Sequence, residues 1–185
     1  MTGEWESRIK TNLPTEPNSF VGRERELGEL CQLVSETRLL SLSGAGGIGK
    51  TRLALRVLAG VVEQFPDGGW FVELGDQRQP DLVISRIAAA VGIGEEPGRP
   101  LLETLAEALR PRRLLLVLDN CEHLLEACAR ACQHLLARSP GLHVVATTRE
   151  PLRIAAETVW QVPPLTVAPA GATVVSPGPG AHVLA

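Results

Sequence analysis

Residues 44–51, with the sequence GAGGIGKT, match the pattern G-x-x-x-x-G-K-[ST] at every position. Glycines let the backbone wrap so that successive N–H groups face phosphate oxygens, and the start of a helix adds partial positive charge there. The pattern predicts that Lys50 reaches the β- and γ-phosphates of a nucleotide and that Thr51 ligates Mg²⁺. A glycine-rich turn before a helix, without a ligand, is the simpler alternative. The candidate phosphate-binding residues are Gly44, Ala45, Gly46, Gly47, Ile48, Gly49, Lys50, Thr51 and Arg52.

Asp119 directly follows the aliphatic run LLLVL at 114–118. A phosphate-binding loop needs an acid for its metal at the end of a buried strand, and Asp119 fits that role through Mg²⁺-bound water. The alternative is that Asp119 or Asn120 caps the helix expected from Glu122. A residue can fill both roles, so we expect Asp119 to contribute to a metal site.

The strand expected over 143–147 ends in Thr147 and is followed by Thr148 and Arg149. Ligands of open α/β sheets bind at the carboxyl ends of the strands, so this end should face the same crevice. There Arg149 is a candidate for a charge-assisted contact with the γ-phosphate. A surface arginine at a strand end is the alternative.

The absence of two motifs indicates which nucleotide base we expect the chain to bind. The guanine-recognition pattern [NT]-K-x-D does not occur, and Lys10 and Lys50 are the only lysines in the chain. The LSGGQ signature of ABC-type ATPases is also missing. We therefore expect an adenine nucleotide, ATP or ADP, with Mg²⁺.

The rest of the sequence supplies the elements that must position these residues. Apolar residues at i, i+3, i+4 and i+7 predict helices, and short aliphatic runs bounded by Gly or Pro predict strands. Helices are expected over 23–36, 50–65, 101–109 and 122–138, with one more between a capping Asp81 and Gly92; strands are expected over 39–43, 70–74, 114–118, 143–147 and 158–162. Their alternation predicts an α/β fold with a parallel sheet and helices on both faces.

The composition bounds the remaining classes of function. The chain has 185 residues, 44% of them apolar, and a net charge of −3, which disfavours sequence-independent nucleic-acid binding. No apolar run approaches the length of a membrane span and the first ten residues hold no signal-peptide core, so we expect no membrane contact and a cytoplasmic location. We also expect a lead-in tail at 1–17, one domain at 18–167 and a low-complexity tail at 168–185.

The cysteines form no CxxC pair, which favours reduced core thiols over a disulfide framework. A metal cluster is the less favoured alternative, because the helical face that would carry it is the apolar one. Its members would be Cys121, Cys128, Cys132, His123 and His134.

Four segments in order, FVGRERE, GAGGIGKT, LLLVLDNCEHL and VVATTREPL, resemble STAND-class P-loop ATPases over about residues 12–167. They are most similar to the ATP-binding module of bacterial LuxR-type and antibiotic-regulatory transcription regulators, and more distantly to NB-ARC domains. The resemblance implies a three-layer P-loop NTPase fold with strand order 5-1-4-3-2. It also implies that Val21, Gly22 and Arg23 lie against adenine, that Asp119 holds Mg²⁺ and that Arg149 senses the γ-phosphate.

Two departures from the family shape the expected activity. Asn120 stands where fast ATPases carry glutamate, and an amide cannot act as general base. Glu122 is the nearest carboxylate and the candidate base, with a place in the first helical turn as its alternative role. We therefore expect a slow ATPase that works as a molecular switch.

The second departure is length, because the family continues into helical, sensor and DNA-binding regions. We expect a truncated regulator whose partners are nucleotide, other domains or a second copy, with no DNA binding by these residues. Two other functions stay open: a P-loop phosphotransferase acting on a small molecule, and a non-catalytic remnant that binds nucleotide weakly or only contacts partners.

Overall fold

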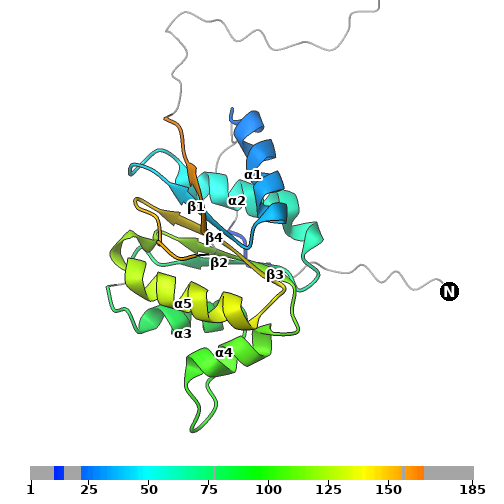
Figure 1. Ribbon diagram of the computed structural model, residues 1–185, viewed down its shortest axis with the longest axis vertical. Coiled ribbons are helices and arrows are strands. Elements are labelled where there is room, and N and C mark those ends of the chain that lie inside the picture. The colour runs from blue at the N-terminus through cyan, green and yellow to red at the C-terminus, as the bar shows by residue number, and fades with distance from the viewer. Residues whose placement is uncertain (1–10, 15–21, 77, 156, 165–185) are drawn as a thin grey trace, which may run out of the picture.

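A parallel sheet lies between two layers of helices (Figure 1). The computed structural model describes residues 11–14, 22–76, 78–155 and 157–164. The helices are α1 (Glu24–Glu36), α2 (Lys50–Val61), α3 (Leu82–Ala90), α4 (Leu101–Leu109) and α5 (Leu125–Arg138), with short 3₁₀ turns at Val62–Gln64 and Cys121–His123. The strands are β1 (Leu39–Ser43), β2 (Gly69–Glu73), β3 (Leu114–Asp119), β4 (Leu142–Thr148) and β5 (Glu157–Gln161).

The five strands follow the order β2-β3-β4-β1-β5, and all four pairings are parallel. This is the expected order 5-1-4-3-2 counted from the other edge, so the predicted α/β fold and sheet order are confirmed. Parallel neighbours need crossover connections, and the helices between strands provide them. The carboxyl ends of β1, β3 and β4 consequently meet at one end of the sheet.

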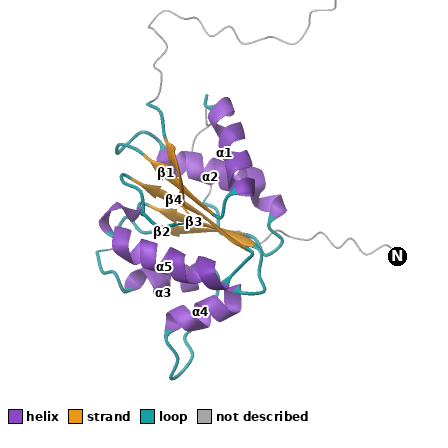
Figure 2. Ribbon diagram, in the orientation of Figure 1, coloured by secondary structure: helices purple, strands orange, loops and turns teal. Residues whose placement is uncertain are grey.

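Side chains alternate along each strand, so each strand serves a hydrophobic core on both faces. In β3, Leu114, Leu116 and Leu118 pack on the side of α3, α4 and α5, whereas Leu115 and Val117 pack on the side of α1 and α2. Figure 2 shows these two helical layers on either side of the strands. The alternation also decides which face a residue at a strand end points to.

Two helices differ from their predicted ranges where the chain tightens. The helix expected over 50–65 is α-helical only to Val61 and then becomes a 3₁₀ turn. The helix expected from 122 begins at Leu125, because Asn120 has a left-handed backbone (φ +65°) that turns the chain into a 3₁₀ segment first. Asp81 precedes α3 as expected, but its side chain makes no capping hydrogen bond.

Strand β2 lies at one edge of the sheet, and residues from the expected N-terminal tail cover part of that edge. Thr11 forms an isolated parallel bridge with Gly69. The Asn12 amide then pairs with Phe71 as a backbone peptide would: its Nδ2 donates to the Phe71 carbonyl at 2.8 Å, and its Oδ1 accepts from the Phe71 N–H at 2.7 Å. The other tail residues, 1–10 and 15–17, and the low-complexity stretch 168–185 lie outside the described residues.

The four cysteines are free thiols, and Cys121, Cys128 and Cys132 are buried together between α5 and the sheet. A hydrogen bond with Cys128 and burial raise the pKa of the Cys121 thiol, and burial raises the pKa of Cys132. Within the described residues, no group of His, Cys, Asp and Glu side chains is arranged to hold a metal ion.

The raised pKa values predict low reactivity, because the thiolate is the nucleophile and a higher pKa leaves less of it at a given pH. At pH 8 iodoacetamide should modify the half-buried Cys31 first and leave Cys121 and Cys132 unmodified in the folded chain, as read by mass spectrometry. All of these thiols should react in denaturant, which is the control. Equal rates for Cys31 and Cys121 in the folded chain would contradict the burial argument.

Candidate functional site

The glycine-rich loop joins β1 to α2, as predicted. Gly47 (φ +79°) and Gly49 (φ +89°) adopt left-handed backbone conformations that favour glycine. Among the described residues, no backbone hydrogen bond uses the N–H groups of residues 45–49. The loop therefore presents a row of available donors beside a helix N-terminus, which is the arrangement that binds anionic oxygen.

Lys50 is 8% exposed and folds back over this loop. Its Nζ donates to the carbonyls of Gly44 and Ala45, both at 2.9 Å. Its positive charge is thus held at the mouth of the loop, beside the available N–H groups. A phosphate placed there would meet a cation and several N–H donors together.

Three side chains from three elements meet at Asp119. The Thr51 hydroxyl donates to the Asp119 carboxylate at 2.8 and 3.0 Å from its two oxygens. The Thr147 hydroxyl donates to Oδ1 of the same carboxylate at 2.6 Å and accepts the backbone N–H of Asn120 at 2.9 Å. Carboxylate and hydroxyl oxygens are the hard donors that Mg²⁺ prefers, so this donor set fits that ion.

The pleat explains why these groups meet. In β3 the odd-numbered residues face α2, which places Asp119 on the α2 side after Val117. In β4, Val145 faces the same side, so Thr147 does too. Thr51 lies in the first turn of α2, which packs on the same face of the sheet as Asp119 and Thr147. We did not predict Thr147 as a site residue, although its odd position in β4 was readable from the sequence.

Arg149 and Glu122 form an ion pair beside the loop, with Arg149 Nε 3.2 Å from Glu122 Oε1. The Arg149 carbonyl accepts a hydrogen bond from the Ser43 hydroxyl at 3.0 Å, which ties this residue to the end of β1. Its Nη2 lies 3.3 Å from the position that a Cβ on Gly46 would take. The structure therefore brings Arg149, Glu122 and the loop together.

The expected adenine segment lies at the same end of the sheet. Gly22 (φ +82°) and Arg23 (φ +67°) lead into α1, and Arg23 Nη2 donates to the Pro163 carbonyl at 2.8 Å. Val162, the residue before Pro163, lies beside Gly44. The Arg23 Nη1 atom is buried and has no hydrogen-bond partner among the described residues. Val21 lies outside the described residues.

The remaining loop residues have structural positions that fit the motif. Ile48 is half-buried, and its side chain occupies the space that a Cβ on Gly44 would need. Arg52 is exposed in the first turn of α2. The fit of the loop thus depends on glycine at position 44 as well as at positions 47 and 49.

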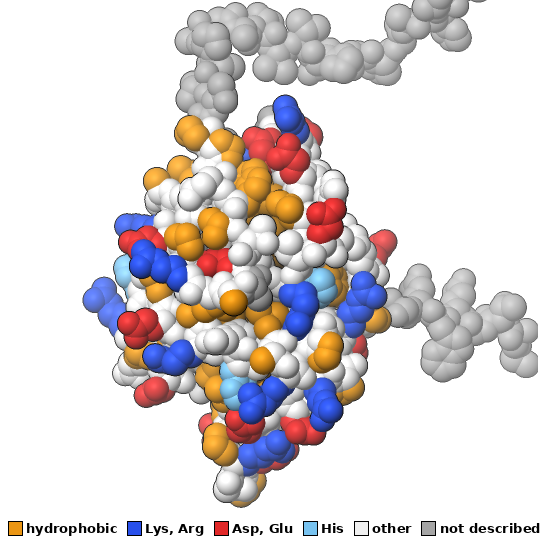
Figure 3. All heavy atoms as spheres, in the orientation of Figure 1, with side chains coloured by type: hydrophobic (Ala, Val, Ile, Leu, Met, Phe, Trp, Pro, Cys, Tyr) orange, Lys and Arg blue, Asp and Glu red, His pale blue; other side chains and the backbone are white. Residues whose placement is uncertain are grey.

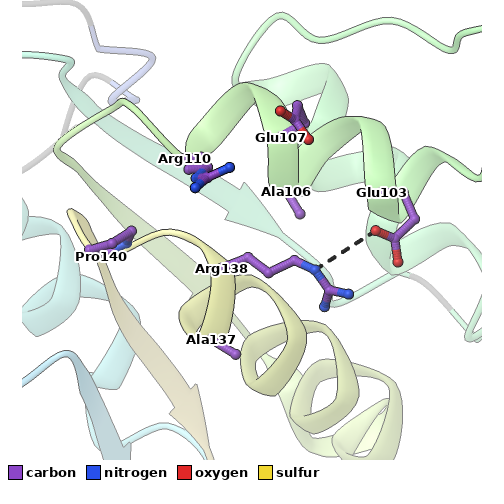
Figure 4. A pocket seen from close by; sticks show the side chains of 7 residues that line it. All are labelled: Glu103, Ala106, Glu107, Arg110, Ala137, Arg138 and Pro140. Carbon is purple, nitrogen blue, oxygen red and sulfur yellow. Dashed lines mark ion pairs between the residues drawn. The ribbon is translucent and has the colours of Figure 1, made fainter.

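A separate hollow of about 420 Å³ lies between α4 and α5 (Figure 4). Arg138 and Glu103 form an ion pair across it, at 3.8 Å. The other lining residues are Ala106, Glu107, Arg110, Ala137 and Pro140. Arg110 and Pro140 precede β3 and β4, so the hollow lies at the amino ends of the strands, opposite the loop. Acidic and basic side chains balance in it, and it shares no residue with the loop site.

The surface shows no dominant charge on the side seen in Figure 3, where acidic and basic side chains are interspersed over the described residues. None of the helices in the described part of the chain has the length and apolar character required to cross a membrane.

Comparison with known sequences gives the following likenesses. The AAA domain family matches residues 33–153. An uncharacterized protein of Mycobacterium tuberculosis is 40% identical over 149 residues, which cover 80% of this chain and 38% of that protein. A putative HTH-type transcriptional regulator of the same organism is 42% identical over 135 residues, which cover 73% of this chain and 15% of the regulator. The chain therefore spans well under two thirds of the length of these relatives.

Comparison with solved structures concerns the fold alone, because the identities are low. A STAND protein with a tetratricopeptide repeat sensor from Pyrococcus horikoshii gives a TM-score of 0.59 at 16% identity, over 84% of this chain and 25% of that one. The ORC2 protein of Aeropyrum pernix gives a TM-score of 0.54 at 17% identity, over 78% and 49% of the two chains. Both likenesses agree with the P-loop NTPase fold.

The hydroxyl of Thr147 should contribute to stability, because it donates a hydrogen bond to the Asp119 carboxylate and accepts one from the Asn120 N–H. We expect Thr147→Val to lower the free energy of unfolding by about 1–3 kcal/mol, measured by urea denaturation. Thr147→Ser is the matched control, since it keeps the hydroxyl and loses only a methyl group, worth about 0.8 kcal/mol. If the two variants lose the same stability, the hydroxyl does not hold Asp119 in place.

Proposed function

The chain belongs to the AAA domain family, and from this premise we propose that it binds ATP and ADP with Mg²⁺ as the nucleotide-dependent switch domain of a transcription regulator. The observation that carries the proposal is the meeting of Thr51 and Asp119 beside a loop whose N–H groups are available. Thr51 and Asp119 supply oxygen ligands for a cation, and the neighbouring N–H groups can donate hydrogen bonds to phosphate. A glycine-rich turn without a ligand would need neither.

The chain's own residues divide the work of binding. The N–H groups of residues 45–49 and the Lys50 ammonium bind the phosphate oxygens, and Lys50 exchanges its two carbonyl partners for them. Thr51 and Asp119 hold Mg²⁺, which neutralises phosphate charge when it is bound. Arg149, paired beside the loop, is the contact for the γ-phosphate.

The base lies against the segment that enters α1. Gly22 and Arg23 form this segment together with Val21. The buried Arg23 Nη1, which has no partner in the part of the chain that the structure describes, is a donor suited to an acceptor on the base or the sugar. The hydrogen bond from Arg23 to Pro163 keeps this segment beside the loop.

Hydrolysis by this site is slow in our proposal. Asn120 follows Asp119 and its amide accepts no proton from water. Glu122 is the nearest carboxylate, and its charge is engaged by Arg149. With an amide at position 120 and the Glu122 carboxylate engaged by Arg149, turnover is slow, so the bound nucleotide persists and defines a state of the protein.

The regulatory setting rests on the relatives. One of them is named a putative HTH-type transcriptional regulator, and this chain covers 15% of its length. We propose that the domain works in the cytoplasm with further domains or with a second copy, and that DNA contact belongs to those other parts.

Lys50→Ala should weaken binding of Mg-ATP by about 10- to 150-fold, because one charge-assisted contact worth about 1.5–3 kcal/mol is lost. Calorimetric titration of the purified chain with Mg-ATP and Mg-ADP measures this. Arg130→Ala, which removes a positive charge from the exposed side of α5, is the control and should bind as the wild type does. Wild-type affinity in Lys50→Ala would remove that lysine from the site, and a wild-type chain that is folded but binds neither nucleotide would end the proposal.

A further inference from the structure

We propose that Glu122 sets how strongly the chain distinguishes a nucleoside triphosphate from a diphosphate, by holding Arg149 in an ion pair that the γ-phosphate must open. The inference rests on the proposed function and assigns to Glu122 a role other than that of general base. The contact between Glu122 and Arg149 joins two side chains that belong to different sequence motifs.

The side chains of Glu122 and Arg149 differ in how exposed they are to solvent. The Glu122 side chain is 12% exposed, whereas the Arg149 side chain is 60% exposed. The carboxylate is therefore the fixed partner, and the guanidinium is the one that can swing. The Arg149 carbonyl accepts a hydrogen bond from Ser43, and the side chain can move while this backbone contact stays in place.

The position of Glu122 is fixed by its neighbours. It lies in the 3₁₀ turn Cys121–His123, and the Cys121 side chain anchors that turn in the core. With the Asn120 amide nitrogen turned toward Glu122, it donates to both carboxylate oxygens, at 2.7 and 2.8 Å. The Asn120 N–H is in turn bound to Thr147. The carboxylate thus keeps a donor partner even when Arg149 leaves.

The guanidinium lies where a third phosphate would compete for it. Its Nη2 contacts the space next to Gly46, within the loop that carries the phosphate-binding N–H groups. Glu122 lies against Nε and the loop lies against Nη2, and both atoms belong to one rigid guanidinium plane. A γ-phosphate that draws this plane toward the loop therefore draws Nε away from Glu122, so the two anions compete for one positive charge. A diphosphate has no γ-phosphate and leaves the ion pair closed.

This competition makes the chain bind a nucleoside triphosphate more weakly than it would without Glu122. Opening a partly exposed ion pair costs a modest amount of free energy, because solvent screens it. The cost falls only on the ligand that recruits Arg149. Glu122 therefore lowers the ratio of ATP affinity to ADP affinity, and it does so through Arg149.

Glu122→Gln tests this directly, because it removes the charge and keeps the side-chain size. Affinities for Mg²⁺ with AMP-PNP, an analogue that resists hydrolysis, and for Mg-ADP are measured by calorimetry on the whole chain. We expect AMP-PNP to bind about two- to fivefold more tightly and ADP to stay within about twofold of wild type. Glu107→Gln removes a carboxylate that pairs with Arg99 and lines the hollow at the end of the sheet opposite the loop, and it should change neither affinity.

The double variant Glu122→Gln/Arg149→Ala separates the ion pair from direct repulsion between Glu122 and phosphate. If Glu122 acts through Arg149, the gain seen in Glu122→Gln disappears when Arg149 is alanine. A gain that persists in that background, or an unchanged affinity ratio in Glu122→Gln, overturns the inference while the wild type still binds. Loss of all nucleotide binding by the folded wild type overturns the proposed function as well.

Discussion

Strand β4 pairs with β1 on one side and with β3 on the other, and this double pairing brings the glycine-rich loop, Asp119 and Arg149 together. Ser43 of β1 stands opposite Thr148, and Leu118 of β3 stands opposite Ala146, so the three strands end together. The loop that follows β1, the carboxylate that ends β3 and the arginine after β4 are consequently neighbours. A shift of one residue in either pairing would turn a whole strand over and separate them.

Much of this arrangement was predictable from the sequence because it depends on local patterns. The glycine and lysine spacing of residues 44–51 indicates the loop, and aliphatic runs before Asp119 and Thr147 indicate strands buried on both faces. Sheet order came from the resemblance to a family rather than from periodicity. The alternation of side chains along β4 also places Thr147 beside Asp119, a consequence that we did not draw from the sequence.

The pairing of Glu122 with Arg149 was not predictable in the same way. The two residues are far apart in the chain, and the direction of Glu122 depends on the left-handed backbone of Asn120 and on the 3₁₀ turn that follows. A regular helix from residue 122, which the apolar spacing predicts, would aim the carboxylate elsewhere. The irregular backbone at this point therefore creates the contact between Glu122 and Arg149, which residue spacing alone does not predict. The buried thiol of Cys121 links the same turn to the core under α5.

The amide of Asn12 on the edge of β2 has a consequence for assembly. An exposed sheet edge is a template for a strand from another molecule, and a sheet with two open edges can be extended from both sides without limit. Here a side chain occupies the backbone groups of Phe71 on one edge. A strand that added to β2 at the position of Phe71 would first have to displace Asn12. Growth of a filament through this edge would therefore carry the cost of breaking both of these hydrogen bonds.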